Sequence, residues 1–252
     1  MDLSAALERR HAPPSGAGDT AAWREAFDVA FWTPRGTFGG HLTLLVGPGP
    51  RCCSWTSVLE EGRPVVTVVE HDVPVPRAPG GLEVRAQGLW ADQNCEEPFV
   101  HWSYGLEAFA LRVDRPEDAI GDGRGERVGL GYDLEWEAVQ GEPPVPLAPS
   151  GAPELAAAAR DTHAFQGGYR QPGHFHGEIL VGADTYELDA VAVRSHWWGS
   201  QPWPGVDSGP EHPDEELVGR CLAEVPGDGV LERRLVRSAE VASLRTHRSA
   251  SA

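Results

Sequence analysis

The residues of this sequence whose types and spacing most directly suggest chemistry are Arg194, His196 and Trp198, in the run GEILVGADTYELDAVAVRSHWWGSQPW. Successive side chains of a β-strand point to opposite faces, so these three share a face with Leu188 and Ala192. The charge on this otherwise apolar face needs an explanation. An arginine does not release its proton, and its burial therefore requires a carboxylate or several carbonyl partners.

Two interpretations of Arg194 follow. In the first, Arg194 forms a bidentate bridge to Asp133, Glu135 or Glu137, the acidic face of the run DLEWE, and locks two parts of the chain together. In the second, Arg194 and His196 lie at the mouth of a barrel, where the positive charge keeps the imidazole neutral and able to accept a proton from a ligand. We expect the lock.

A second group with metal-ligating side chains is His174, His176 and Glu178, which project from one face of a strand. Two imidazoles and a carboxylate can ligate zinc or iron. The opposite face carries Phe175 and Ile179, so a polar outer face explains the same pattern. We expect no metal at these residues and no other cofactor.

Acid catalysis would need a carboxylic acid of raised pKa as proton donor, for example to hydrate an alkene. Asp189, Glu135 and Asp133 are the candidates for that donor, and His196 is a further candidate catalytic residue. Each of the three acids is better explained as a solvated strand residue. The sequence has no G-x-S-x-G elbow, phosphate loop, dinucleotide fingerprint or kinase signature, so serine hydrolysis, phosphoryl transfer and hydride transfer are not supported.

The run YRQPGHFHGEILVGADTYELDAVAVRSHWWGSQPW resembles the signature of lipocalin-like proteins related to carotenoid 1,2-hydratase and AttH. PFVHWSYGLEAFALRVDRPEDA, followed by GYDLEWE, is similar to the closing strands of the first barrel in uncharacterised bacterial members. The resemblance implies two consecutive calycin-type barrels around an apolar cavity. Arg194, His196, Trp198 and Gly199 carry over from the signature. Departures from it are Ser195, Trp197 and Gln201.

Tryptophan is abundant, and in an all-β protein its side chains are usually core. Some of them could instead line an apolar cavity, where their faces would also stabilise a carbocation. We expect a ligand to contact the signature residues and several aromatic side chains. The predicted ligand-binding residues are Arg194, His196, Trp198, Tyr186, Trp102 and Trp136.

Short runs rich in Val, Leu, Thr and Trp, divided by turn residues, predict a mostly antiparallel all-β protein. The expected organisation is a flexible leader (1–21), a first lipocalin-like barrel (22–148), a linker with a helical run (149–164, helix at Leu155–Arg160), and a second, shorter barrel with an acidic, proline-rich tail (165–252). The second barrel could be incomplete. The last forty or so residues fit either a hairpin or a terminal helix.

Charge and composition bear on partners and location. The 252 residues carry a net charge of -17, with 38 acidic residues against 21 arginines and no lysine. This charge would repel nucleic acid and anionic membranes. The four cysteines show no C-x-x-C spacing, which predicts reduced thiols. No signal peptide and no run near the ~18 apolar residues of a membrane span are found, so we expect a cytoplasmic protein.

These observations predict binding of a hydrophobic small molecule, isoprenoid- or polyketide-like, in a β-barrel cavity. An enzyme that hydrates, isomerises or cyclises such a molecule is the first alternative, since a preorganised cavity can be enough for such reactions. A structural or partner-binding protein without a ligand is the second alternative. The oligomeric state is left open.

Overall fold

The computed structural model describes residues 6–11, 24–35, 37–46, 51–76, 81–114, 125–146 and 166–199. Apart from a short helical turn at residues 6–7, the regular structure in these ranges is β. The strands are β1 (Arg24–Trp32), β2 (Phe38–Val46), β3 (Arg51–Glu60), β4 (Val65–Pro74), β5 (Val84–Ala86), β6 (Leu89–Glu97), β7 (His101–Val113), β8 (Glu126–Ala138), β9 (Val145–Pro146), β10 (Gln166–Val181) and β11 (Asp184–Gly199).

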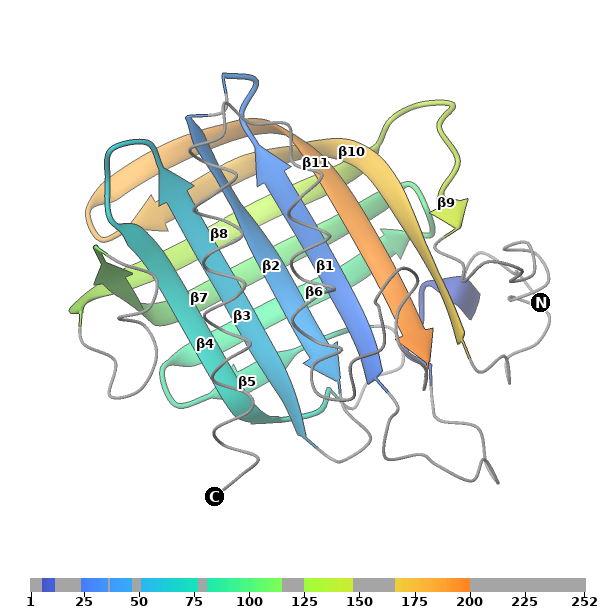
Figure 1. The fold of residues 1–252 in the computed structure, drawn as a ribbon, viewed down its shortest axis with the longest axis horizontal. Helices are drawn as coiled ribbons and strands as arrows, with labels where there is room; N and C mark the ends of the chain where they lie inside the picture. Colours follow the sequence, from blue (N-terminus) through green and yellow to red (C-terminus); the bar gives the residue numbers. More distant parts are fainter. Residues whose placement is uncertain are drawn as a thin grey trace, which may run out of the picture.

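Eight of these strands close into an antiparallel barrel. Their order is β4-β3-β2-β1-β11-β10-β8-β7, and β4 pairs back onto β7. Closure removes the free edges that an open sheet would present. Figure 1 shows β1 to β4 crossing in front of β6 to β8. Strands β6 and β5 extend the sheet beyond β7, and β9 pairs with β10. The prediction of an antiparallel all-β fold is therefore confirmed.

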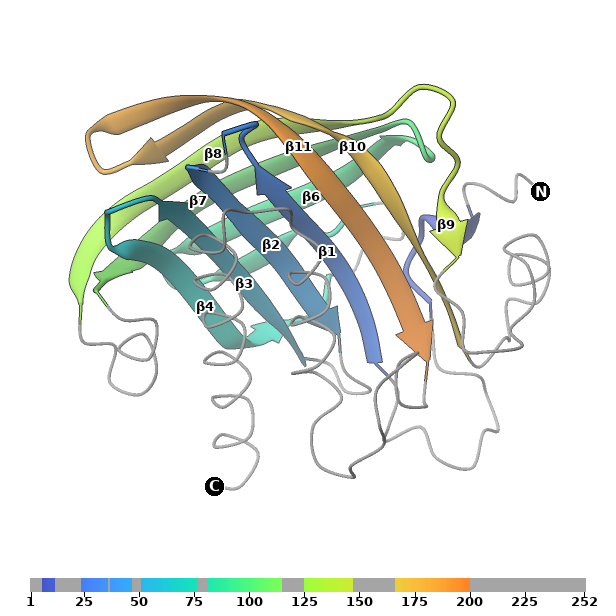
Figure 2. The same cartoon turned by 45° about the horizontal axis from the view of Figure 1, so that its top comes forward.

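The hairpin of β10 and β11 belongs to this same barrel. A tight turn at Gly182 and Ala183 joins the two strands, and Gly182 has a φ of 65°, which suits a glycine. β10 pairs with β8, and β11 pairs with β1. Figure 2 shows both strands arching from one layer to the other. The expectation that a second barrel opens near residue 165 is not met, because the hairpin fills the gap between the first and last strands of the preceding segment.

The remaining predictions concern the leader, the linker helix, the tail, the cysteines and membrane spans. The leader was expected to be flexible, yet Leu7 and Glu8 are buried against the barrel. The linker helix at Leu155–Arg160 and the tail after residue 199 lie outside the described residues. Cys52 and Cys95 are free thiols, and Cys221 lies outside the described part. Within that part, no helix has the length and hydrophobicity needed to cross a membrane.

Large side chains fill the inside of the barrel. Phe27, Phe31, Tyr104, Trp136 and Phe175 are among the residues of one continuous buried cluster. Phe175 contacts both Phe31 and Tyr104 edge-on, at ring-centroid distances of 5.3 Å each. Such T-shaped contacts link the two layers of the barrel.

The outer side of β1 to β4 is buried as well. A second apolar cluster on that side includes Trp32, Trp55 and Leu59. Among these residues stands His41, which is 2% exposed, lies edge-on to Trp55, and has no hydrogen-bond partner on either ring nitrogen. Burial lowers the pKa of His41 to about 3, because the charged ring would lose its hydration.

The glycine of the Gln-Pro-Gly run has a packing role. Gly173 pairs with Ala138 on β8, and the Trp136 indole covers it. A Cβ at Gly173 would lie 2.3 Å from the indole nitrogen of Trp136 and 2.6 Å from the Glu137 carbonyl oxygen. Only glycine leaves room for this tryptophan.

We expect Gly173→Ala to destabilise the protein by about 1 to 3 kcal/mol or more, because the added methyl group overpacks a closed site. Gly129→Ala is the matched control, since a Cβ at Gly129 on β8 meets nothing within 4 Å. The control should leave the melting temperature unchanged or raise it slightly. Thermal unfolding followed by circular dichroism compares the two, and equal melting temperatures would show that the Trp136 indole moves aside freely.

His41 should make the protein sensitive to acid. The unfolded chain takes up a proton on this imidazole near pH 6.5, whereas the folded chain resists until about pH 3. Stability is therefore lost as the pH falls below about 6.5, at up to ~1.4 kcal/mol per pH unit. We expect His41→Leu to lose less stability than the parent between pH 6.5 and pH 4 in urea titrations. Identical slopes for the two proteins would contradict the assignment of a neutral, unpaired His41.

Candidate functional site

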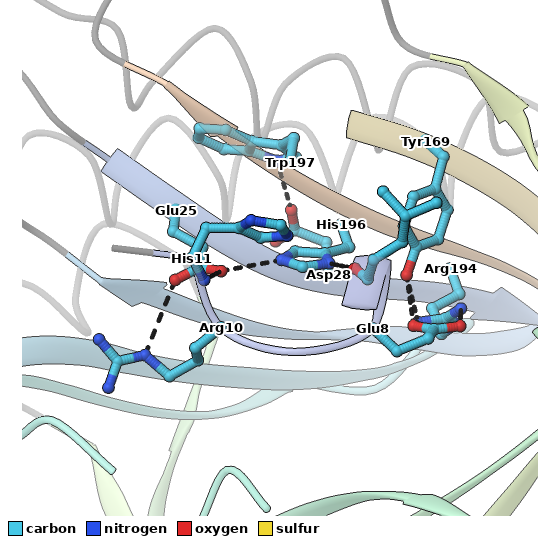
Figure 3. A network of polar contacts seen from close by, with 10 residues as sticks. Glu8, Arg10, His11, Glu25, Asp28, Tyr169, Arg194, His196 and Trp197 are labelled. Carbon is cyan, nitrogen blue, oxygen red and sulfur yellow. Dashed lines mark hydrogen bonds and ion pairs between the residues drawn. The ribbon is translucent and has the colours of Figure 1, made fainter. Parts of the chain in front are cut away.

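The N-terminal segment 6–11 contributes to a buried polar network at one end of the barrel (Figure 3). Leu7 packs with Tyr169 of β10 and Trp198 of β11, and Phe99 lies against them. Glu8, Arg10 and His11 of the same segment make polar contacts with the strands. These residues lie at the end of the barrel where β11 finishes and β1 begins.

Arg194 pairs with Glu8. Its Nη2 donates to Oε1 at 2.7 Å and its Nη1 donates to Oε2 at 2.9 Å, and the two side chains are only 3% and 2% exposed. Tyr169 donates its hydroxyl hydrogen to Oε2 of the same carboxylate. This bidentate geometry is the strongest that an arginine and a carboxylate can form.

Aromatic rings surround the guanidinium. Its carbon lies 4.8 Å from the ring centre of Trp102, 4.9 Å from that of Trp136 and 5.3 Å from that of Tyr169. Aromatic faces attract a cation, and this attraction offsets part of the free-energy cost of removing the Arg194 guanidinium from water. The three rings come from β7, β8 and β10, so the arginine of β11 contacts side chains from three other strands.

The Glu8 carboxylate is also held by the turn between β6 and β7. Phe99 donates its backbone N–H to Glu8 Oε1 at 2.8 Å, and its carbonyl accepts from Gln171 Nε2 at 2.9 Å. Phe99 has a φ of 60°, which is uncommon for a residue with a side chain. Such a backbone persists only where its surroundings fix it, and here both its polar groups are bonded.

Burial alone would raise the pKa of Glu8. The Arg194 guanidinium, with the hydrogen bonds from Arg194, Tyr169 and Phe99, outweighs burial and holds the pKa below its usual range. Glu8 is therefore a carboxylate and Arg194 a guanidinium. The expected lock exists, but the prediction that Asp133, Glu135 or Glu137 supplies the carboxylate is wrong.

A second set of polar groups lies beside this pair. His196 is fully buried, and its Nδ1 lies 2.9 Å from the Leu7 carbonyl oxygen while its Nε2 lies 3.0 Å from Glu25 Oε1. The backbone N–H of His11 donates to the same Oε1 at 2.7 Å. The His11 ring stacks on Trp198 at 3.7 Å with an interplanar angle of 11°. Burial raises the pKa of Glu25 to about 7 and lowers the pKa of His196 to about 3.

Asp28 is a further buried acid, on the outer face of β1. Trp197 donates its indole N–H to Asp28 Oδ2 at 3.0 Å, and Oδ1 has no partner. Burial raises the pKa of Asp28 to about 7, against the opposing effect of hydrogen bonds from Thr43 and Trp197. Trp197, one of the departures from the lipocalin-like signature that the sequence resembles, thus has a partner in this chain.

The predicted ligand-binding residues fall at two places. Arg194, His196, Trp198, Trp102 and Trp136 meet at the closed end, where all are buried. The interpretation that Arg194 and His196 protrude at a barrel mouth is therefore wrong. Tyr186 lies near the opposite end of β11 and lines a cavity there.

The predicted catalytic acids do not meet. Asp189 and Asp133 are exposed. Glu135 is half-buried on the outer face of β8, where it lies 2.5 Å from His101 Nε2. His174 and Glu178 are exposed, and His176 lies 3.9 Å from Glu137. Among the described residues the group with metal-ligating geometry is another one, namely His11, Glu25 and His196.

A cavity of about 230 Å³ opens at the Tyr186 end. Tyr186 stacks on Phe38 at 4.9 Å and donates its hydroxyl hydrogen to Glu60 Oε2 at 2.9 Å. Arg63 lies 3.3 Å from Asp184 and donates to the Tyr186 hydroxyl at 3.2 Å. We refer to this cavity as the mouth cavity. The residues lining it are Phe38, Val58, Glu60, Arg63, Pro64, Val66, Arg112, Val181, Asp184 and Tyr186.

Residues 4–209 match the family described as Domain of unknown function (DUF7064). The chain belongs to this DUF7064 family. The match spans every strand of the barrel together with Glu8 and His11. No curated protein matches the sequence.

Among solved structures, the crystal structure of CghA with Sch210972 is similar. The identity is 9% and the TM-score 0.39, over 78% of this chain and 53% of that chain, so the DUF7064 chain spans about half the length of that protein. These comparisons do not name carotenoid 1,2-hydratase or AttH, and the resemblance to them stays a prediction.

Sequence reasoning missed Glu8, Glu25 and Tyr169. A signal for Glu25 was present. It directly precedes the apolar run AFDVAFW and shares a strand face with Phe27 and Phe31, just as Arg194 shares a face with apolar residues of its own strand. Glu8 gave no such signal, since it precedes a proline- and glycine-rich stretch that suggests a loose terminus.

We expect Arg194→Met to destabilise the protein by about 3 to 5 kcal/mol, because Glu8 would remain buried without its partner. At roughly 2 to 4 °C per kcal/mol, the melting temperature should fall by about 6 to 20 °C. The double variant Glu8→Leu, Arg194→Met should recover part of that loss, because no charge is left unpaired.

Arg85→Met serves as the control for these thermal melts, since Arg85 and its partner Glu83 are 69% and 49% exposed and such pairs contribute little. A melting temperature for Arg194→Met within a degree or two of the parent would contradict the lock.

Proposed function

We propose that this protein binds a hydrophobic small molecule at the mouth cavity. The observation that carries the proposal is the composition of that cavity: its apolar side chains continue the core of the barrel, whereas its charged side chains lie toward solvent. Binding sites for small molecules typically combine an apolar lining with a few placed polar groups.

The apolar part of the mouth cavity includes Phe38, Val58 and Val66, all buried core residues. The rim carries Arg63 and Asp184, which are 55% and 57% exposed. An apolar ligand that enters here would place its hydrocarbon portion on the valines and the Phe38 ring and any polar end beside the rim charges. This orientation follows from the cost of burying polar groups without partners.

Size restricts the ligand. Sites that enclose a drug-sized molecule usually measure about 300 to 1,000 Å³. At about 230 Å³, the mouth cavity fits a small ligand or one end of a longer isoprenoid- or polyketide-like chain. In the second case, the rest of the ligand would extend out of the mouth cavity.

Binding is favoured over hydration, isomerisation or cyclisation. A proton donor to an alkene needs a buried acid in contact with the substrate. The acids among the described residues lining the mouth cavity are Glu60 and Asp184, with side chains 30% and 57% exposed. The buried acids Glu25 and Asp28 are on β1 and do not line it. A protein without a ligand remains the alternative that the following experiment tests.

Filling the mouth cavity should abolish binding. Val58→Phe places a larger side chain into the cavity, and we expect the affinity of the folded variant for a fluorescent polyene fatty acid to fall at least tenfold. Leu180→Phe is the matched control, because Leu180 lines an open groove beside Phe109 on the outer surface and is 41% exposed. Equal loss in both variants, or no binding by the parent, would contradict the proposal. Native mass spectrometry of the parent would identify a ligand retained from the cell.

A further inference from the structure

We propose that His11, Glu25 and His196 bind a divalent transition-metal ion, with zinc as the first candidate. One ligand atom from each residue lies within 4.8 Å of the other two. The three residues join the N-terminal segment to β1 and β11, at the end of the barrel away from the mouth cavity. This site is independent of the proposed ligand binding.

The hydrogen bonds of His196 leave one nitrogen for a metal. Its Nδ1 faces the Leu7 carbonyl oxygen at 2.9 Å, and a carbonyl only accepts, so Nδ1 carries a hydrogen. In a neutral ring the lone pair is then on Nε2. A backbone carbonyl that holds the distal N–H of a histidine is a usual second contact of a metal ligand, because it fixes the ring orientation.

That lone pair faces another acceptor. Nε2 of His196 lies 3.0 Å from Oε1 of Glu25. An unprotonated nitrogen and a carboxylate oxygen repel each other at this distance unless a proton or a cation lies between them. The geometry therefore requires a hydrogen or a metal cation between these two atoms.

A metal ion accounts for more of the site than a proton does. Oε2 of Glu25 and Nε2 of His11 are both buried without a hydrogen-bond partner. Glu25 is fully buried, and the contact of its Oε2 with the Arg10 guanidinium, at 3.7 Å, is longer than a hydrogen bond. A proton between His196 and Glu25 leaves both atoms without a hydrogen bond, whereas a metal ion can take the two imidazoles and the carboxylate together.

The ligand set fits zinc. Two imidazole nitrogens and one carboxylate are a known catalytic zinc set, with bonds of about 2.0 to 2.2 Å and a fourth position for water. Ligand atoms around such an ion lie roughly 3.4 Å apart, so His11 would have to move inward by about 1 Å. It can slide along the Trp198 ring, on which it is stacked.

Arg10 is the neighbouring charge that opposes a cation. Its Nε lies 3.7 Å from Glu25 Oε2, beyond hydrogen-bond distance. Its Nη1 donates to the carbonyl oxygen of Pro76, two residues after β4, at 2.8 Å, so the guanidinium has an anchor that does not involve Glu25. A bound ion would fasten residues 6–11 to the barrel through His11.

The test uses the full-length protein, freed of metal with a chelator and then titrated with Zn²⁺. We expect one equivalent to bind and to raise the melting temperature, because the ion binds the folded chain. His11→Gln and Glu25→Gln should each weaken binding at least tenfold. The control is the double variant His174→Ala, His176→Ala, which removes both histidines of β10 and should bind Zn²⁺ as the parent does.

X-ray absorption of the zinc-loaded parent gives a second measurement that needs no variant to fold. We expect two imidazoles and an oxygen ligand in the first coordination shell, at about 2.0 to 2.2 Å. The proposal is overturned if the parent binds less than one equivalent, which would assign a proton to the gap between His196 and Glu25. It is also overturned if the His174, His176 double variant loses the metal while His11→Gln keeps it.

Discussion

The contact between Arg194 and Glu8 is the constraint on which the closed end of the barrel depends. A guanidinium inside a barrel cannot lose its proton, and without a carboxylate it would be a buried, unpaired charge. Glu8 supplies the carboxylate, and Tyr169 and the Phe99 amide bind the same group. The rings of Trp102 and Trp136 enclose the cation. Each of these positions is explained by the need to satisfy one charge pair.

The sequence predicted the local structure of this region well. Alternation placed Arg194 and His196 on the apolar face of β11, and the turn residues marked the β10–β11 hairpin. It also predicted that Arg194 must have a carboxylate partner. It misassigned the partner, because Asp133, Glu135 and Glu137 alternate with the buried residues of β8 and so face outward. Glu8 is 186 residues away from Arg194, and no periodicity connects them.

The number of barrels was harder to predict for a related reason. The alternation of apolar and polar residues shows which face of a strand is buried, but it does not show which other strands pair with its two edges. Two strands after a proline-rich stretch are compatible with a new barrel or with the completion of an earlier one. Here β11 pairs with β1 and β10 pairs with β8, and the proline of the Gln-Pro-Gly run is accommodated at Pro172, just beyond the residues that pair with β8. The number of barrels is thus determined by these long-range strand pairings.

The pairing of β11 with β1 has a consequence for how the chain folds. Arg24 lies opposite Gly199, so the contact that closes the barrel spans nearly the whole described sequence. Contacts of such high sequence separation carry a large loop-closure entropy and slow folding. During synthesis, β1 and β8 each keep an unpaired edge until the β10–β11 hairpin, which can form locally, pairs with both of them. Until residue 199 has left the ribosome, these two edges can pair with strands of other chains, which favours aggregation.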